Sequence, residues 1–158
     1  MTVVPIELAE WLAVGRWRDA PADVSRRVED ISSFAGKRLD RLRKRIRHEG
    51  RGLANLDDEP RHGVRKDAKK LRYAAEFLGS LYPGRKARRR LDHLLDRIEA
   101  LQDKLGQLND IAAAPELLAR LGLEIDLAAP GKKTRKRMLA EAEDCFEALI
   151  DTKRFSRV

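Results

Sequence analysis

Cysteine and aromatic residues are scarce in this chain of 158 residues, and each scarcity excludes a class of protein. Cys145 is the only cysteine, so no disulfide can form within the chain, which fits a reducing cytoplasm. Aromatic residues make up 5% of the sequence, too few for a platform on which nucleic-acid bases stack. No apolar run approaches the ~20 residues of a membrane-spanning helix, and the N-terminal residues do not form a signal peptide. We therefore expect a cytoplasmic protein without a membrane span.

Signatures of catalysis are also missing. The sequence contains no glycine-rich phosphate loop, no HExxH motif and no cysteine cluster. Its histidines are too dispersed to indicate a metal site, and no clustered carboxylates indicate a Mg²⁺ site for a phosphohydrolase. No serine or cysteine has a neighbouring base signature. The sequence therefore predicts a binding module rather than an enzyme, with no cofactor and no metal.

Positive charge is abundant and unevenly distributed. Lys and Arg number 34 against 26 Asp and Glu, which gives a formal net charge of +8. This excess favours a polyanionic partner such as polyphosphate, nucleic acid or an anionic membrane. Most of the basic residues fall in four short runs, at residues 37–51, 61–72, 85–90 and 132–137.

Apolar residues recur with the helical period throughout the chain, and no stretch alternates as a strand would. The helices that this period predicts cover residues 5–16, 22–49, 58–81, 85–111 with a break or kink near Pro115 before a continuation to Leu121, and 133–153. The last four have a single apolar stripe each, so we expect an all-α fold: an antiparallel four-helix bundle with an additional short N-terminal helix.

Two regions follow from this pattern. Residues 1–20 form an apolar N-terminal helix that serves as a packing or interface element, and residues 21–158 form the helical bundle. The helix at 5–16 is apolar nearly all round, with Trp11 within it and Trp17 directly after it. Leaving that apolar surface in water is unfavourable, so we expect the helix to cover its own bundle or to meet a second copy of the chain.

Residues 62–76 carry the most specific pattern. At 100° per residue, seven polar residues of this helix share an arc of roughly 120°. They are His62, Arg65, Lys66, Lys69, Arg72, Tyr73 and Glu76. Such a side is suited to a long anionic ligand; a solvated basic face is the alternative. The histidine and the tyrosine favour the ligand, because a solvated face has little use for either.

A second basic stripe lies on the preceding helix. Its members, at spacings of three, four and three, are Arg38, Arg41, Arg45 and His48. If the two helices pack as antiparallel neighbours, the two stripes border one groove that suits phosphate, which Arg binds in a bidentate manner. Alternatively, these long side chains lie over the edges of the core and pair with Asp40, Glu49 or Glu76.

Two amides stand out in the segment LQDKLGQLND, residues 101–110. Gln102 and Asn109 lie at the edge of the apolar stripe, where polar groups must be hydrogen-bonded. We expect them to bridge helices and orient the basic side chains.

These two segments resemble the signature of the CHAD domain, the conserved histidine α-helical domain. The residues that carry the resemblance are His62, Arg65, Lys69, Leu71, Arg72, Tyr73, Glu76 and Phe77, followed by Leu101, Gln102, Leu105, Gly106, Leu108, Asn109 and Asp110. Both motifs occur in the order of the family. The basic helix that precedes them and Phe155 near the end extend the resemblance over most of the chain.

The resemblance implies an all-helical fold, usually of two four-helix bundles, with a basic groove that binds inorganic polyphosphate. It also implies targeting to polyphosphate granules and a link with CYTH triphosphate-hydrolase domains. The implied ligand contacts are His62, Arg65, Lys69, Arg72 and Tyr73, with Arg38, Arg41 and Arg45 as partners. To these the helical stripes add His48 as a contact, and we expect Gln102, Asn109 and Glu76 in support. The chain resembles the C-terminal half of such a domain, so a second copy or a missing N-terminal half would complete the groove. A nucleic-acid-binding basic domain is the alternative function.

Overall fold

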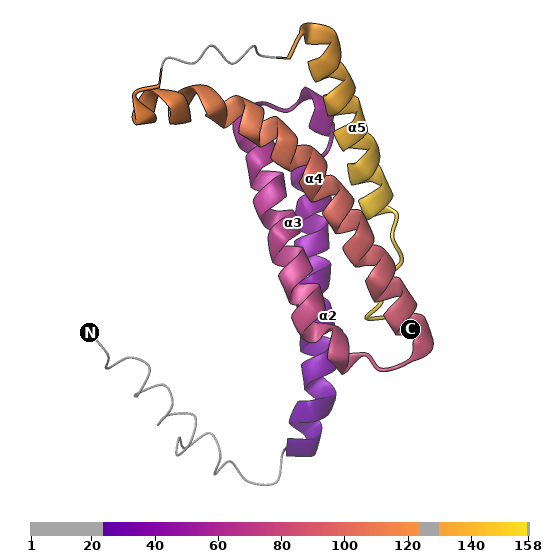
Figure 1. Cartoon of the computed structure of the whole chain (residues 1–158). Helices are drawn as coiled ribbons and strands as arrows, with labels where there is room; N and C mark the ends of the chain where they lie inside the picture. The colour runs from indigo at the N-terminus through magenta and orange to yellow at the C-terminus, as the bar shows by residue number, and fades with distance from the viewer. Residues whose placement is uncertain (1–23, 124–129, 158) are drawn as a thin grey trace, which may run out of the picture. The chain divides into compact units, whose positions relative to one another are not determined.

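Four long helices make up the part of the chain that the computed structural model describes, residues 24–123 and 130–157. They are α2 (Val24–Glu49), α3 (Asp58–Leu78), α4 (Arg85–Leu121) and α5 (Lys132–Ile150), with short 3-10 turns η2 (Leu53–Asn55) and η3 (Gly79–Leu81) (Figure 1). No strand occurs within the described residues, so the predicted all-α fold is confirmed. The helix predicted at 5–16, and with it the region 1–20, lies outside the described residues.

Glycine marks the end of α2. Gly50 follows the helix and is buried against Phe146, where a Cβ atom would collide with the aromatic ring. Gly52 adopts a left-handed conformation with φ of 66°, which glycine adopts at little cost. The chain therefore reverses within a few residues and starts α3 in the opposite direction.

Of the break or kink predicted near Pro115, the break is absent, because α4 runs without interruption from Arg85 to Leu121. The helix bends in its C-terminal third, which agrees with the predicted kink (Figure 1). Proline lacks the N–H that would bond the carbonyl four residues earlier, and its ring crowds that carbonyl. Pro115 and its neighbours Glu116 and Leu117 are exposed, so the proline lies in a part of α4 that water reaches.

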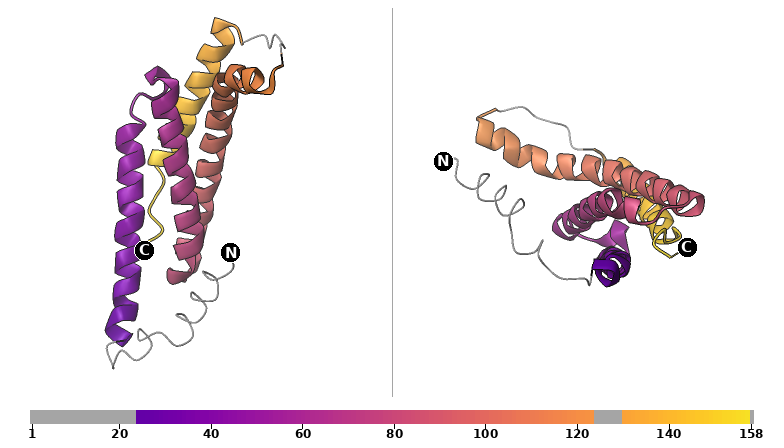
Figure 2. Two further views of the ribbon diagram at one scale, coloured as in Figure 1. Left: turned by 90° about the vertical axis from the view of Figure 1, so that its left-hand side faces the viewer. Right: turned by 90° about the horizontal axis from the view of Figure 1, so that it is seen from below.

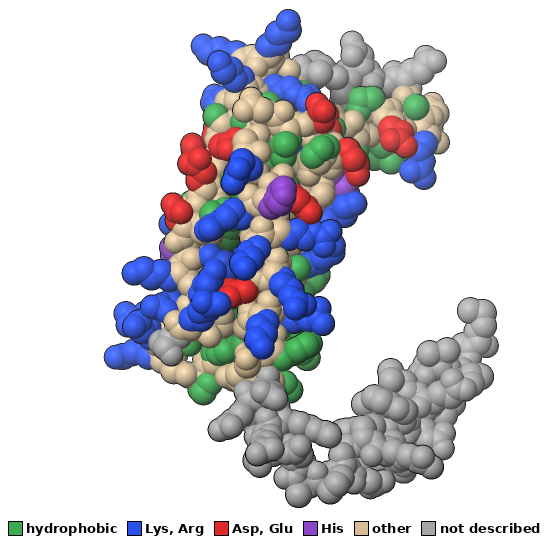
Figure 3. Space-filling model, turned by 180° about the vertical axis from the view of Figure 1, so that it is seen from behind, with side chains coloured by type: hydrophobic (Ala, Val, Ile, Leu, Met, Phe, Trp, Pro, Cys, Tyr) green, Lys and Arg blue, Asp and Glu red, His purple; other side chains and the backbone are tan. Residues whose placement is uncertain are grey.

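The chain divides into two units, Met1–Phe34 and Ala35–Val158, and the second contains the bundle. Successive helices of this unit run in opposite directions, and α3 lies between α4 and the part of α2 from Ala35 onward (Figure 2). α4 packs on both α3 and α5, while α5 contacts η2. Lys and Arg side chains gather on the face where α2 is outermost (Figure 3).

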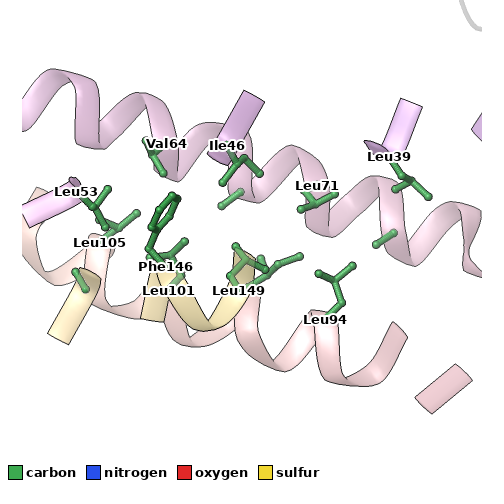
Figure 4. Packing of buried hydrophobic residues seen from close by; sticks show 14 of the residues in the cluster. Leu39, Ile46, Leu53, Val64, Leu71, Leu94, Leu101, Leu105, Phe146 and Leu149 are labelled. Atoms are coloured by element: carbon green, nitrogen blue, oxygen red, sulfur yellow. The ribbon is translucent and has the colours of Figure 1, made fainter. Parts of the chain in front are cut away.

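The core is built from the apolar stripes that the sequence predicts. Leu94, Ile98 and Leu101 of α4 have no exposed surface, and they face buried residues of the other helices. Leu39, Ile46, Leu53, Val64, Leu71, Leu94, Leu101, Leu105, Phe146 and Leu149 meet in one cluster (Figure 4). Because these stripes fix which side of each helix is buried, they also fix which side is left for polar residues.

We expect Leu101→Ala to lower the free energy of unfolding by about 2–5 kcal/mol, because a fully buried leucine leaves a cavity when truncated. Leu121→Ala is the matched control on the same helix: its side chain is 61% exposed, so the change should stay within about 0.5 kcal/mol. Urea denaturation followed by circular dichroism measures both. Equal losses in the two variants would contradict this account of the core.

Candidate functional site

A cavity of about 710 Å³ opens between α3 and α4. We call it the α3/α4 groove. The residues that line it from α3 are Arg65, Lys69, Arg72, Tyr73 and Glu76, and those from α4 are Gln102, Asp103, Gly106, Gln107 and Asp110. Both sets come from the two motifs that the sequence singled out, although the motifs lie about 25 residues apart.

The α3 side of the groove follows from the amphipathicity of the helix. Val64 and Leu71 are buried in the core, so residues on the opposite side face outward. Arg65, Lys69 and Arg72 are spaced by four and three residues, and such residues are neighbours on a helix surface. The ammonium group of Lys69 lies 5.8 Å from the centre of the Tyr73 ring, a cation–π geometry. The result is a row of cations beside an exposed tyrosine.

The α4 side carries amides and carboxylates. Asp103 and Asp110 are exposed and line the groove opposite the cations of α3. Formal charges within the groove therefore balance: the cations are Arg65, Lys69 and Arg72, and the carboxylates are Glu76, Asp103 and Asp110. An anion that enters the groove meets both signs of charge.

Glu76 holds Arg72 in place. The Nε atom of Arg72 lies 3.0 Å from Oε1 of Glu76, and its Nη1 atom lies 3.9 Å from Oε1 of Glu99. The hydrogen bond from Arg72 to Glu76 raises the pKa of the guanidinium group. Partly exposed pairs of this kind contribute about 0–1 kcal/mol to stability, so exchanging Glu76 for another anion costs little.

Gly106 keeps the groove open. It lies in the interior of α4, where glycine is less favourable than alanine by about 1 kcal/mol. Packing does not require this glycine, because a Cβ atom would have only the Nε atom of Arg65 as a neighbour, at 4.0 Å. The glycine thus leaves space beside Arg65 at a cost in helix stability.

His62 links the two helices instead of lining the groove. Its Nδ1 atom lies 2.7 Å from Oδ1 of Asn109, which requires the proton on Nδ1 for a hydrogen bond. Both side chains line a separate small cavity with Leu105 and Leu108 of α4. The bond therefore sets how α3 and α4 meet at one end of the groove, and a direct contact of His62 with a ligand stays a prediction.

The second basic stripe, on α2, is exposed but does not line the α3/α4 groove. Its members are Arg38, Arg41, Arg45 and His48. Arg45 lies 2.9 Å from Asp67 on α3 and 3.0 Å from Glu49 on its own helix. The groove thus joins five of the seven polar residues predicted on α3 to α4, and it leaves out His62, Lys66 and the α2 stripe. A channel shared by α2 and α3 stays a prediction.

Asp67 connects α2 to α3 by charge. Its side chain is only 4% exposed, and besides Arg45 it contacts Lys70 at 2.7 Å. Burial alone would raise the pKa of this carboxyl, but the hydrogen bond and charge of Lys70 and the charge of Arg45 outweigh it and lower the pKa. Arg45 therefore has a structural partner in addition to any ligand.

We expect Asp67→Asn to lower the free energy of unfolding by about 1–3 kcal/mol at pH 7, because two cations lose a buried partner. A lowered pKa means that the carboxylate stabilises the fold above its unfolded value of about 3.9, and that this contribution is lost as the pH falls through the folded value. The difference between the two proteins should therefore shrink below about pH 4. Denaturant titrations at several pH values measure it.

Asp92→Asn is the control, because Asp92 pairs with Arg88 where both side chains are exposed. This exposed pair should contribute no more than about 1 kcal/mol at any pH. If Asp67→Asn behaved like Asp92→Asn, the proposed link between α2 and α3 would be absent.

Sequence reasoning gave no site role to four residues of the groove: Asp103, Gly106, Gln107 and Asp110. The available signals were the motif that contains Gly106 and Asp110 and the glycine in the middle of a long helix. Within the described ranges, no group of three His, Cys, Asp or Glu side chains is placed to hold a metal ion, and no helix has the length and apolarity to cross a membrane.

Comparison with known families matches the model of the CHAD domain to residues 5–119 of the chain. The match contains α3, both motifs and nearly all of α4, and it ends before α5 and Phe155. Neither the curated proteins nor the solved structures yielded a match.

Proposed function

The chain belongs to the CHAD domain family, and we propose that it is a binding module for inorganic polyphosphate rather than an enzyme. CHAD domains are associated in general with polyphosphate. The observation that carries the proposal is the row of Arg65, Lys69 and Arg72, which line one groove with Tyr73 and lie within the residues that the family model matches.

The geometry of α3 suits a linear anion. A helix rises by about 1.5 Å per residue, so the cations from Arg65 to Arg72 extend over roughly 10 Å along the axis. A phosphate chain aligned with the helix can meet each of them in turn. The guanidinium groups offer paired donors to phosphate oxygens, and Lys69 supplies a compact charge.

Exposed cations beyond the groove extend this surface for a longer chain. The α2 stripe of Arg38, Arg41, Arg45 and His48 is exposed, and Lys66 is exposed on α3. Affinity would then increase with chain length, because each further phosphate contact releases counterions.

We assign no reaction to the groove. By the same proposal, a second copy or an N-terminal half supplies another wall, and a CYTH-type hydrolase or a polyphosphate granule supplies the cellular setting.

Single-stranded nucleic acid is the second candidate, favoured by two aromatic side chains beside the cations. Tyr73 is 57% exposed and Phe77 is 82% exposed, and they lie four residues apart on α3. Bases stack on such rings, but two rings make a short platform. Polyphosphate requires only the charges, so it remains the leading proposal.

We expect Lys69→Glu combined with Arg72→Glu to weaken polyphosphate binding on the order of 100-fold and to lower the slope of affinity against salt by about two, because two phosphate contacts are lost. Titration calorimetry with long-chain polyphosphate at two salt concentrations measures both quantities. Single-stranded DNA of matched total charge, titrated in parallel, distinguishes the second candidate.

Lys133→Glu combined with Lys136→Glu is the matched control, since it changes the net charge equally at exposed positions of α5 outside the groove. It should weaken binding only a few-fold. Equal weakening in both double variants would mean that net charge alone attracts the ligand. Tighter binding of DNA than of polyphosphate would overturn the proposed ligand.

The carboxylates of the groove give an independent test. We expect Asp103→Asn combined with Asp110→Asn to tighten polyphosphate binding by about three- to tenfold at low salt, since removing a nearby like charge changes the energy on the order of 1 kcal/mol. The same titration, with EDTA and then with Mg²⁺, measures the change. Weaker binding that depends on Mg²⁺ would show instead that Asp103 and Asp110 hold cations carried by the ligand.

A further inference from the structure

A second concentration of positive charge surrounds the end of α5, away from the residues of the α3/α4 groove. Two cavities, of about 240 Å³ and 390 Å³, share Asp151 and Thr152 and therefore adjoin. The first is lined from α2 and the C-terminal segment by Arg43, Lys44, Arg47, Ile150 and Arg154, and the second mainly from α4 by Lys86, Arg89, Arg90, His93 and Lys153. We call the two together the C-terminal basic surface.

The charges of this surface do not balance. Asp151 is the one carboxylate among its lining residues, against four Arg and Lys in each cavity. The nearby Asp40 already contacts Arg154 at 3.0 Å and Arg157 at 2.6 Å. In this respect the surface differs from the α3/α4 groove, whose carboxylates equal its cations in number.

Part of this charge has a structural role. Arg43 donates from Nη2 to the carbonyl of Thr152 at 2.6 Å, and Arg47 donates to that of Ile150 at 3.2 Å. On the other side, Arg90 donates to the carbonyl of Arg154 at 3.0 Å. Cations stabilise a helix C-terminus because its last carbonyls lack partners and carry the negative end of the helix dipole. These three arginines therefore fix the C-terminal segment to α2 and α4.

That role leaves the rest of the surface unexplained. Lys44 and Lys153 are exposed and line the same cavities, as Lys86 and Arg89 do. The Nη1 atom of Arg43 is buried and has no hydrogen-bond partner in the described structure. Burial lowers the pKa of Arg43, and the charges of Arg154 and Arg47 lower it further, so these guanidinium groups repel one another. An anion placed among them would relieve that repulsion.

We propose that the C-terminal basic surface is a second anion-binding site, which takes a short run of linked phosphates such as an oligophosphate. Its arginines offer paired donors, and its lysines lie on both sides of the bend at Asp151 and Thr152. Among the described residues, no aromatic side chain except His93 lines it, so stacked bases find no platform there. The site goes beyond the proposed function, because it shares no residue with the α3/α4 groove.

Titration of the full chain with tripolyphosphate tests the proposal, and hydrogen exchange of residues 150–157 locates the binding. We expect the wild type to bind at two classes of site and to gain protection in this segment. Lys44→Glu combined with Lys153→Glu removes one exposed lysine from each cavity and retains the three arginines that hold the segment. This variant should lose the protection and bind at least tenfold more weakly at one class, with the other unchanged.

Lys69→Glu combined with Arg72→Glu should have the opposite effect. This variant should lose tripolyphosphate binding in the α3/α4 groove and keep the protection of residues 150–157 from hydrogen exchange. If only Lys44→Glu combined with Lys153→Glu loses that protection, the C-terminal basic surface binds the anion, even if the groove binds nothing. Failure of one proposal can therefore be distinguished from failure of the other. If the charge reversal unfolds the chain, Lys44→Gln combined with Lys153→Gln replaces it in the same titration. A single class of site that the groove variant abolishes would overturn the inference. Equal weakening of tripolyphosphate binding by Lys133→Glu combined with Lys136→Glu would also overturn it. The same holds if DNA of matched charge protects residues 150–157 more strongly than tripolyphosphate does.

Discussion

The packing of α3 on α4 is the constraint on which the rest of this structure depends. Val64, Leu71 and Ala75 of α3 are buried together with the leucines of α4, and fully burying one such large apolar side chain stabilises a fold by about 1.5–3 kcal/mol. Because these residues face inward, the helical period places Arg65 and Lys69 on the outer side of α3. The hydrophobic stripe thereby determines where the cations point, although it makes no contact with a ligand.

Around that core, many charged residues bind other parts of the same chain. Asp67 joins Arg45 to α3, Asn109 joins His62 to α4, and Arg43 holds the C-terminal segment. A basic residue in this protein is therefore not automatically a ligand contact. The distinction lies in whether its charge is matched locally, which residue type and spacing do not show.

The two candidate sites differ in this respect. The α3/α4 groove holds equal numbers of cations and carboxylates and lies wholly within the residues that the family model matches. The C-terminal basic surface has a large excess of cations, and its lining from residues 150–154 lies beyond the match. A balanced groove favours reversible binding, because an incoming polyanion is attracted by one wall and repelled by the other. An unbalanced surface attracts anions from a distance and depends more on salt.

The sequence by itself determined the all-α fold, the buried stripes and the starts of α3 and α4, because helix period, glycine and proline act within a few residues. It also identified the side of α3 that carries Arg65, Lys69 and Arg72, since a helical wheel needs no tertiary information. Only the tertiary structure decided that α4 forms the other wall of the groove, that Asp67 partners Arg45, and that the last residues of the chain meet Arg43. The physical reason is that periodicity fixes the angle of a side chain about its own helix, whereas the helix it faces depends on how all the stripes pack together.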